Sequence, residues 1–227
     1  DWIARFAAGL LEDQREFGLS VLGGDTVATP GPASFSLTII GAVEPGRAIR
    51  RKGAKPGDEV WVSGTIGDGA LGLKVLQGAI PGDAGGFLAD RYRLPRPRLA
   101  LGRVAAPHVS AGMDVSDGLA QDLGHMCRAA GCGAEIVIDD VPLSPAARVA
   151  LAADPSLMPA ILSGGDDYEL LLAVPLGQGD ALKAAASACG MSVTRVGRFA
   201  EGPPEVILRR SDNTAMSLAA LGWSHFR

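Results

Sequence analysis

The segment that most constrains this chain is Asp114-Val115-Ser116-Asp117-Gly118, which stands between an apolar stretch and a helical pattern. If Met113 to Ser116 forms the end of a strand, Asp114 and Ser116 project to the same face of the sheet. Asp117 stands where the N-cap of the following helix belongs. Apolar residues then recur at helical spacing, at Leu119, Leu123, Met126, Cys127 and Ala130. This spacing predicts one buried helix face.

The predicted helix start after Gly118 brings two carboxylates and a hydroxyl next to free backbone N–H groups. Such N–H groups and the positive end of the helix dipole attract anions. Oxygen ligands beside them suit Mg²⁺ together with a phosphorylated ligand. The simpler interpretation, which the segment alone leaves open, is a plain aspartate cap.

Two further motifs also present acidic residues at a glycine pair. Gly23-Gly24-Asp25-Thr26 follows a predicted short strand at Val21-Leu22, and a hairpin turn is the structural alternative for it. Ser163-Gly164-Gly165-Asp166-Asp167-Tyr168-Glu169 precedes a second apolar run, which is predicted to be a strand. Three separated acidic motifs favour a shared function over three unrelated caps.

The order of the predicted elements indicates an α+β fold with mixed, largely antiparallel sheets flanked by helices. Helices are predicted from the N-terminus to about Phe17 and over 180–189, and strands over 35–43, 59–63, 134–138, 192–199 and 205–210. The stretch 50–58 is polar and contains Pro56, so it is the best candidate for a domain boundary. Its cations are typical of a solvated linker, although they could also reach a phosphate.

Two other patterns were weighed against this interpretation. Gly67, Gly69 and Gly72 satisfy G-x-G-x-x-G after a predicted strand, but the glycine-rich stretch 78–97 lacks the second strand that a dinucleotide fold requires. No G-x-x-x-x-G-K-[ST] sequence occurs, which excludes a P-loop. A zinc site at His125, Cys127 and Cys132 would have only three ligands, two of them on an apolar helix face.

Composition narrows the possible partners. The net charge of −4, without a long basic stretch, argues against nucleic acid, while metal ions bound to the carboxylates would still allow a nucleotide. No apolar run reaches membrane-spanning length and no signal peptide is visible, so no membrane partner is expected. Three cysteines without framework spacing favour a reduced, cytoplasmic protein.

The three acidic motifs, together with the terminal Gly222-Trp223-Ser224-His225-Phe226, resemble the thiamine-monophosphate kinase family of the aminoimidazole-ribonucleotide-synthetase-like superfamily. The resemblance covers nearly the whole chain, and the motifs follow one another in the same order as in the family. It implies transfer of the γ-phosphoryl group of ATP to thiamine monophosphate, which gives thiamine diphosphate, with several Mg²⁺ ions. Participation of K⁺ is left open. It also implies a homodimer for the full-length protein.

The resemblance assigns residues to three roles. The positions that match ATP contacts are Gly24, Asp25, Arg51 and Ser116. Those that match Mg²⁺ ligands are Asp25, Asp114 and Asp117, and those that match contacts to the thiamine part are Asp166 and Trp223. No catalytic base is expected, because the acceptor phosphate is largely dianionic near neutral pH and needs positioning and charge neutralisation instead.

The chain departs from the family in two ways. Asp166 stands where the family usually has glutamate, which puts the substrate contact there in question. An upstream segment with further metal-binding aspartates is not in this chain, so 1–48 is expected to be the remainder of an N-terminal ATP-, Mg²⁺- and dimer-forming domain, and 53–227 the C-terminal domain. We therefore expect the 227-residue chain alone to be inactive or nearly so.

Alternative functions stay open at this point. Another ATP-using enzyme of the superfamily, such as selenophosphate synthetase or aminoimidazole ribonucleotide synthetase, would share the single motifs. A non-catalytic nucleotide-binding scaffold would share them too. The combination of Asp166-Asp167-Tyr168-Glu169 with Trp223 favours the kinase.

Overall fold

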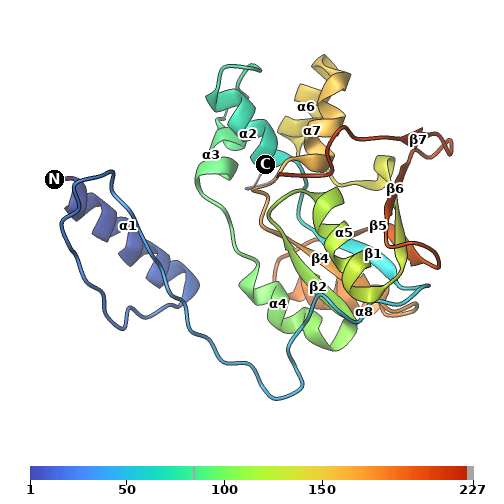
Figure 1. The fold of residues 1–227 in the computed structure, drawn as a ribbon, viewed down its shortest axis with the longest axis horizontal. Coiled ribbons are helices and arrows are strands. Elements are labelled where there is room, and N and C mark those ends of the chain that lie inside the picture. The colour runs from blue at the N-terminus through green and yellow to red at the C-terminus, as the bar shows by residue number, and fades with distance from the viewer. Residues whose placement is uncertain (84, 224–227) are drawn as a thin grey trace. The chain divides into compact units, whose positions relative to one another are not determined.

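The computed structural model describes residues 1–83 and 85–223. The chain divides into two compact units, Asp1–Val43 and Glu44–Arg227, and each is described by itself (Figure 1). The sequence-based assignment of 1–48 as the remainder of a larger domain stays a prediction.

The first unit consists of helix α1 (Trp2–Phe17) and an extended segment. The Asp1 side chain accepts a hydrogen bond from the Ile3 N–H at 3.1 Å, and Gly18 ends the helix in the left-handed conformation, as the predicted helix requires. Phe35 packs against Trp2 and Phe6. The strands predicted at Val21-Leu22 and over 35–43 are wrong: these residues alternate as a strand does, but among the described residues they have no strand to pair with.

The second unit is built on one seven-stranded sheet with the order β2-β4-β1-β5-β3-β6-β7. Its strands are β1 (Glu59–Ser63), β2 (Ala111–Val115), β3 (Gly133–Val137), β4 (Glu169–Val174), β5 (Val193–Ala200), β6 (Val206–Arg209) and β7 (Ala215–Met216). All neighbouring pairs are antiparallel except β3 and β6, which are parallel. The predicted α+β class with a mixed, largely antiparallel sheet is confirmed.

Both faces of this sheet are covered, because alternate strand residues enter two different cores. Val60 and Val62 of β1 belong to the larger core, which includes α2 (Asp68–Leu76), α5 (Leu119–Ala130) and α7 (Met158–Ser163). Trp61 belongs to the smaller core, with α4 (Leu99–Ala105) and α8 (Gly179–Ala188). Both faces are therefore buried. Of the three acidic motifs, the two in this unit, 114–118 and 163–169, lie at the end of β2 and at the start of β4.

The remaining elements are short. Helix α3 (Phe87–Arg93) lies within the stretch 78–97, which the sequence pattern left without an element. Helix α6 (Pro145–Ala153) begins at Ser144, whose hydroxyl accepts the Ala147 N–H at 3.0 Å. Single 3₁₀ turns are η1 (Ala106–His108), η2 (Ile138–Asp140) and η3 (Pro155–Leu157). Among the described residues, no helix is both long and apolar enough to span a membrane.

Candidate functional site

A pocket of about 850 Å³ in the second unit brings together residues that the sequence placed in separate motifs. Ser116 and Asp117 come from the β2–α5 turn, Asp166 comes from the glycine pair before β4, and Trp223 comes from the C-terminal segment. The other wall is one face of α2, formed by Ala70, Leu73, Lys74 and Gln77. The pocket thus contains four of the predicted site residues and also Lys74, which the sequence did not identify as a site residue. The only signal was that Lys74 lies four residues after Ala70, on the same face of a helix.

The turn between β2 and α5 differs from the predicted cap. Gly118, not Asp117, is the N-cap of α5, and no side chain caps it. Instead, the carboxylate of Asp122 in the first turn of α5 reaches back, and its Oδ2 accepts hydrogen bonds from the Ser116 and Asp117 N–H groups, both at 3.0 Å. The Asp117 side chain is therefore not used as a cap and faces the pocket. Asp114, half-buried in β2, does not line the pocket.

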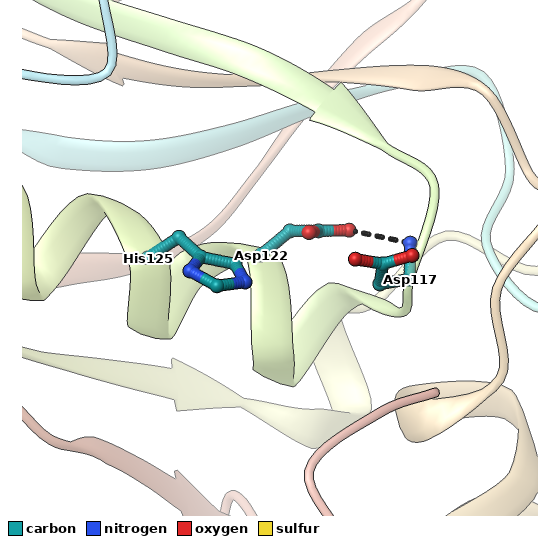
Figure 2. Close-up of side chains that lie close together, drawn as sticks. All are labelled: Asp117, Asp122 and His125. Carbon is teal, nitrogen blue, oxygen red and sulfur yellow. Dashed lines mark hydrogen bonds between the residues drawn. The ribbon is translucent and has the colours of Figure 1, made fainter. Parts of the chain in front are cut away.

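Asp122 is a candidate site residue that sequence reasoning did not identify. It is 1% exposed, and its Oδ1 has no hydrogen-bond partner within the described part of the chain. Burial raises its pKa to about 6, and the nearby Asp117 and Asp114 carboxylates act in the same direction. Ligand atoms of Asp117, Asp122 and His125 lie within 4.8 Å of one another (Figure 2). The signal in the sequence was the spacing of Asp122 and His125, three residues apart on one helix.

His125 joins this cluster through its position on α5 and not through the cysteines. Arg128 Nη2 lies 2.9 Å from His125 Nδ1. Burial, then Arg128 and Arg51, lower the pKa of His125, so the imidazole is neutral near pH 7. Cys127 and Cys132 are buried free thiols, and burial raises the pKa of Cys127 to about 12. Inert thiols on the core side agree with the sequence argument against zinc.

The second glycine-pair motif, 163–169, holds Asp166 at the pocket with an unusual backbone. Asp166 and Tyr168 have φ of 70° and 51°, in the left-handed region that costs a non-glycine residue on the order of 1 kcal/mol. Their N–H groups donate to the carbonyls of Ser116 at 3.0 Å and Val115 at 2.8 Å. The Tyr168 hydroxyl donates to Asp166 Oδ1 at 3.3 Å. Two strained residues are thus held by the turn that carries the first motif.

Asp167, the neighbour of Asp166, points away from the pocket into the start of α2. Its carboxylate accepts the Gly67 N–H at 2.7 Å and the Gly69 N–H at 3.0 Å. It is fully buried, and this burial raises its pKa to about 7. These glycines belong to the G-x-G-x-x-G pattern, so the protein's own carboxylate fills the position that a pyrophosphate would take. The geometry excludes dinucleotide binding at this turn.

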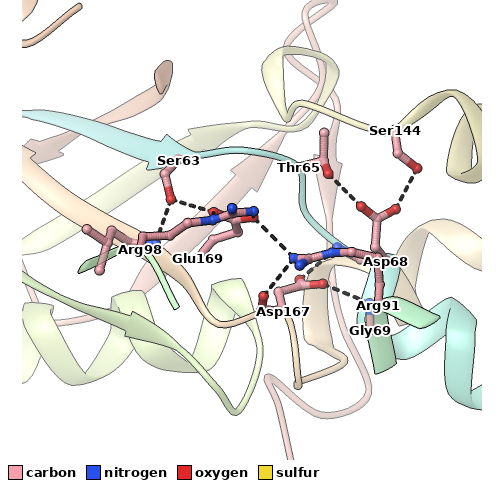
Figure 3. Close-up of polar contacts among 11 residues, drawn as sticks. Ser63, Thr65, Asp68, Gly69, Arg91, Arg98, Ser144, Asp167 and Glu169 are labelled. Atoms are coloured by element: carbon pink, nitrogen blue, oxygen red, sulfur yellow. Dashed lines mark hydrogen bonds and ion pairs between the residues drawn. The ribbon is translucent and has the colours of Figure 1, made fainter. Parts of the chain in front are cut away.

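Glu169 also lies outside the pocket, in a buried network of charges (Figure 3). Arg98 binds its carboxylate through Nε and Nη2, and Arg91 Nη2 donates to it at 3.2 Å. The Ser63 hydroxyl donates to Glu169 Oε2 at 2.6 Å. In the same region Asp68 accepts hydrogen bonds from Thr65 and Ser144. Asp167 and Glu169 therefore support the motif structurally, while Asp166 faces the ligand side.

The C-terminal segment reaches the pocket by binding the start of α5. The Trp223 N–H donates to the Asp117 carbonyl at 2.9 Å, and Gln121 Nε2 donates to the Trp223 carbonyl at 2.5 Å. The Trp223 side chain is 59% exposed at the rim of the pocket, so a ligand can reach its indole ring. Ser224, His225 and Phe226, which contributed to the sequence resemblance, lie outside the described residues.

The remaining predicted site residues do not line this pocket. Gly24 and Asp25 belong to the first unit, where the Asp25 carboxylate accepts the Thr26 N–H at 2.8 Å. Arg51 is exposed and lies close enough to His125 to affect its pKa. The ATP-binding roles of these three residues stay predictions.

Comparison with known proteins identifies the family. A family model described as AIR synthase related protein, C-terminal domain, matches residues 55–209. A thiamine-monophosphate kinase of Caulobacter vibrioides is 43% identical over 223 residues, which are 97% of this chain and 62% of that protein. The thiamine-monophosphate kinase of Salmonella typhimurium is 37% identical over 229 residues, which are 99% of this chain and 69% of that protein. The chain belongs to the thiamine-monophosphate kinase family.

The fold agrees with this membership of the thiamine-monophosphate kinase family. A solved structure described as AaThiL complexed with AMPPCP and TMP is 29% identical and superimposes with a TM-score of 0.65, covering 78% of this chain and 54% of that one. This chain therefore spans between about half and two thirds of the lengths of these relatives. The matched range 55–209 contains the turn at Ser116 and Asp117 as well as Asp166, and Trp223 lies beyond it.

Proposed function

We propose that this chain carries the substrate-binding part of an enzyme that phosphorylates thiamine monophosphate to thiamine diphosphate with ATP. The observation that carries the proposal is the pocket of about 850 Å³, which Ser116, Asp117, Asp166 and Trp223 line together. Relatives bearing the name thiamine-monophosphate kinase support it, as does the related structure described as a complex with AMPPCP and TMP. AMPPCP is an ATP analogue whose terminal phosphate cannot be transferred.

The reaction joins two anions, so the protein's task is to position them and offset their charge. A phosphate oxygen of thiamine monophosphate attacks the γ-phosphorus of ATP, the bond from that phosphorus to the β–γ bridging oxygen breaks, and ADP leaves with the bonding electrons. The attacking phosphate is largely dianionic near neutral pH, so no side chain has to remove a proton. Lys74, on the α2 wall of the pocket, supplies a cation that can pair with a phosphate there.

The thiamine side of the pocket fits a flat cationic ring system. The exposed indole of Trp223 offers a face for stacking and for a cation–π contact with the thiazolium ring. Asp166 is on the same pocket and can offset the ring's positive charge or accept a hydrogen bond from the aminopyrimidine. Its side chain is one methylene shorter than that of the family's usual glutamate, and the residue still lines the pocket.

The side chains around the β2–α5 turn fit a divalent cation that prefers oxygen ligands. Asp114 and Asp117 are the residues we propose to hold Mg²⁺. The buried carboxylate of Asp122 adds negative charge at this turn, while its own bonds go to the Ser116 and Asp117 N–H groups. When bound, Mg²⁺ would neutralise charge that develops on the transferred phosphoryl group. K⁺ participation, the Mg²⁺ contact of Asp25 and the ATP contacts of Gly24, Asp25 and Arg51 are part of the same proposal.

We also propose that the enzyme works as a homodimer in the cytoplasm. The first unit exposes apolar side chains along its extended segment, among them Leu37, Ile39 and Ile40. Exposed large apolar side chains in one segment are typical of a surface that another chain covers. Sedimentation analysis over a range of concentrations tests this part of the proposal, and a monomer at every concentration would contradict it for this chain.

Calorimetry of residues 1–227 tests the proposed function. Thiamine monophosphate should bind when Mg²⁺ and AMPPCP are present, and thiamine without phosphate should bind at least tenfold more weakly, since the phosphate contacts are lost. Trp223→Ala should weaken binding by about tenfold or more because the stacking face is removed. Asp180→Ala, an exposed change on α8, is the control and should leave the affinity unchanged.

Chromatographic separation of thiamine phosphates after incubation with ATP distinguishes a kinase from a binding scaffold. Formation of thiamine diphosphate and ADP in equal amounts would establish the reaction, and at an ordinary enzyme rate it would overturn the expectation that residues 1–227 alone are inactive. If the folded chain bound no thiamine phosphate with Mg²⁺ and AMPPCP present, the proposed function would be wrong. Binding of selenide- or ribonucleotide-derived substrates in its place would redirect the assignment within the superfamily.

A further inference from the structure

Three successive carbonyl groups, at the end of β2 and in the β2–α5 turn, hold further residues that line the pocket. The carbonyl of Val115 accepts the Tyr168 N–H at 2.8 Å, and that of Ser116 accepts the Asp166 N–H at 3.0 Å. The carbonyl of Asp117 accepts the Trp223 N–H at 2.9 Å. The side chains of this turn face the proposed phosphate and metal side, while its backbone positions the proposed thiamine side.

Asp122 fixes the orientation of two of these carbonyls. A trans peptide is planar, with its N–H and C=O pointing in opposite directions. The Ser116 N–H shares a peptide plane with the Val115 carbonyl, and the Asp117 N–H shares one with the Ser116 carbonyl. Asp122 Oδ2 accepts both N–H groups at 3.0 Å (Figure 2 shows the bond to Asp117). Holding the two N–H groups on one side therefore aims the two carbonyls at Tyr168 and Asp166 on the other.

This role differs from ordinary helix capping. The two N–H groups that Asp122 binds belong to Ser116 and Asp117, which precede the N-cap residue Gly118. A capping side chain instead bonds to N–H groups inside the first turn of its helix. The carboxylate of Asp122 thus orders the turn and leaves the helix end itself uncapped.

Gln121, the residue before Asp122 in α5, also binds Trp223, through the Trp223 carbonyl. Gln121 Nε2 donates to the Trp223 carbonyl at 2.5 Å, while Asp117 accepts the Trp223 N–H. Trp223 is therefore bound through its N–H to the turn and through its carbonyl to the first turn of α5. The first turn of α5 and the β2–α5 turn together carry both sides of the pocket.

We propose that Asp122 is a positioning residue that couples the phosphate and metal side of the pocket to its thiamine side. The inference rests on the proposed function for the identity of the two ligands. A ligand that orders the side chains of Ser116 and Asp117 also orders the peptide planes that hold Asp166 and Tyr168. Binding of Mg²⁺ with the ATP analogue and binding of thiamine monophosphate should therefore strengthen each other, as linkage requires.

Amide hydrogen exchange of the unliganded chain tests the positioning role without any ligand. In Asp122→Ala, exchange of the Asp166 and Tyr168 amides should accelerate at least tenfold relative to the Phe199 amide, which bonds to the Asp58 carbonyl elsewhere in the sheet. Asp122→Asn keeps a carbonyl oxygen for both N–H groups and should stay within about threefold of the unmodified chain. Gln121→Ala should accelerate the Trp223 amide alone.

Asp122→Glu provides a variant that keeps the charge and moves it by one methylene. It should also accelerate hydrogen exchange of the Asp166 and Tyr168 amides. If Asp122→Ala does not fold, this variant tests the positioning role in its place. Unchanged exchange of these amides in a folded Asp122→Ala or Asp122→Glu protein would overturn the positioning role. So would an Asp122→Asn protein as perturbed as the alanine variant.

Calorimetry then tests the coupling. In the unmodified chain, Mg²⁺ with AMPPCP should tighten thiamine monophosphate binding at least about fivefold. Asp122→Glu should bring this ratio close to one, while Asp122→Asn should preserve it. If both ligands bind and the ratio is unchanged in Asp122→Glu, the coupling is wrong and the proposed function stands. If the unmodified chain binds neither ligand, the proposed function fails, and the exchange data still judge the positioning role.

Discussion

The carboxylate of Asp167 lies 2.7 Å from the backbone nitrogen of Gly67, a residue one hundred positions earlier in the chain. Burial raises the pKa of Asp167 to about 7, far above its ordinary value near 3.8. The folded state therefore keeps a proton that the unfolded chain has lost, so this group's contribution to stability falls as pH rises from about 4 to about 7. Relative to Asp167→Asn, the free energy of unfolding of the unmodified chain should fall on the order of 2–4 kcal/mol across this range.

Urea denaturation at several pH values measures this difference. The pKa of Asp139 supplies a control of opposite sign, because a backbone hydrogen bond from Ser211 lowers it. The stability of the unmodified chain relative to Asp139→Asn should therefore fall as pH drops below about 4. A flat difference between pH 4 and pH 7 for Asp167→Asn would show that the Asp167 carboxylate ionises normally in the folded protein.

Gly69 should not tolerate a side chain. A Cβ at this position would lie 2.5 Å from the carbonyl oxygen of Asp166, so Gly69→Ala should destabilise the protein by about 1–3 kcal/mol and displace the pocket residue Asp166. Gly102 in α4 is the matched control, since a Cβ there would meet only Leu170 Cδ1 at 4.0 Å. Gly102→Ala should raise stability by up to about 1 kcal/mol through helix propensity. Thermal unfolding curves compare the two, and equal effects would contradict the prediction.

The stability of the folded protein should depend strongly on the buried ion pairs between Glu169 and the two arginines that contact it. Glu169→Gln leaves the Arg91 and Arg98 guanidinium groups without their anion, and it should cost about 3–5 kcal/mol in the free energy of unfolding. The exposed pair of Lys183 and Asp180, with 3.9 Å between nitrogen and oxygen, is the comparison. Asp180→Ala should change stability by less than about 1 kcal/mol. Denaturant unfolding measures both changes, and a small loss for Glu169→Gln would argue that water reaches these arginines.

Stabilisation by ATP should require the divalent cation. At a ligand concentration about 100 times its dissociation constant, ATP with Mg²⁺ should stabilise the chain by about 2.7 kcal/mol, and a chelator should abolish the gain. Asp117→Asn should reduce this stabilisation by more than half, because it removes a proposed Mg²⁺ ligand. Asp180→Asn, on the distant helix α8, should keep it. Thermal shift assays give the comparison, and an equal gain with and without Mg²⁺ would remove Asp117 from the proposed metal site.

The sequence predicted the elements whose pattern is local. The spacing of Leu119, Leu123 and Met126 identified α5 and its buried face, and the strand predicted over 192–199 corresponds to β5. The sequence-based prediction failed where an element depends on a neighbouring strand. Residues 35–43 alternate as a strand does, but among the described residues no strand pairs with them. Helix α3 was missed because glycines and charges surround it, although it contributes the buried Arg91.

The candidate site shows the same division. The acidic motifs were visible as sequence, and the pocket contains Ser116, Asp117, Asp166 and Trp223. The roles within each motif were not visible, because Asp166 and Asp167 are adjacent in sequence and point to different environments. The function of Asp122 depends on which N–H groups its carboxylate meets, and only the three-dimensional turn determines that.

The start of α2 meets the consensus of a cofactor-binding turn while its N–H groups are already satisfied from within the chain. The G-x-G-x-x-G pattern therefore indicates a backbone turn whose N–H groups can bind an anion. It does not indicate whether that anion is a ligand from solution or a distant aspartate of the same chain. In this chain the aspartate after the Gly164-Gly165 pair supplies that anion, so the polypeptide acts as its own ligand at this turn.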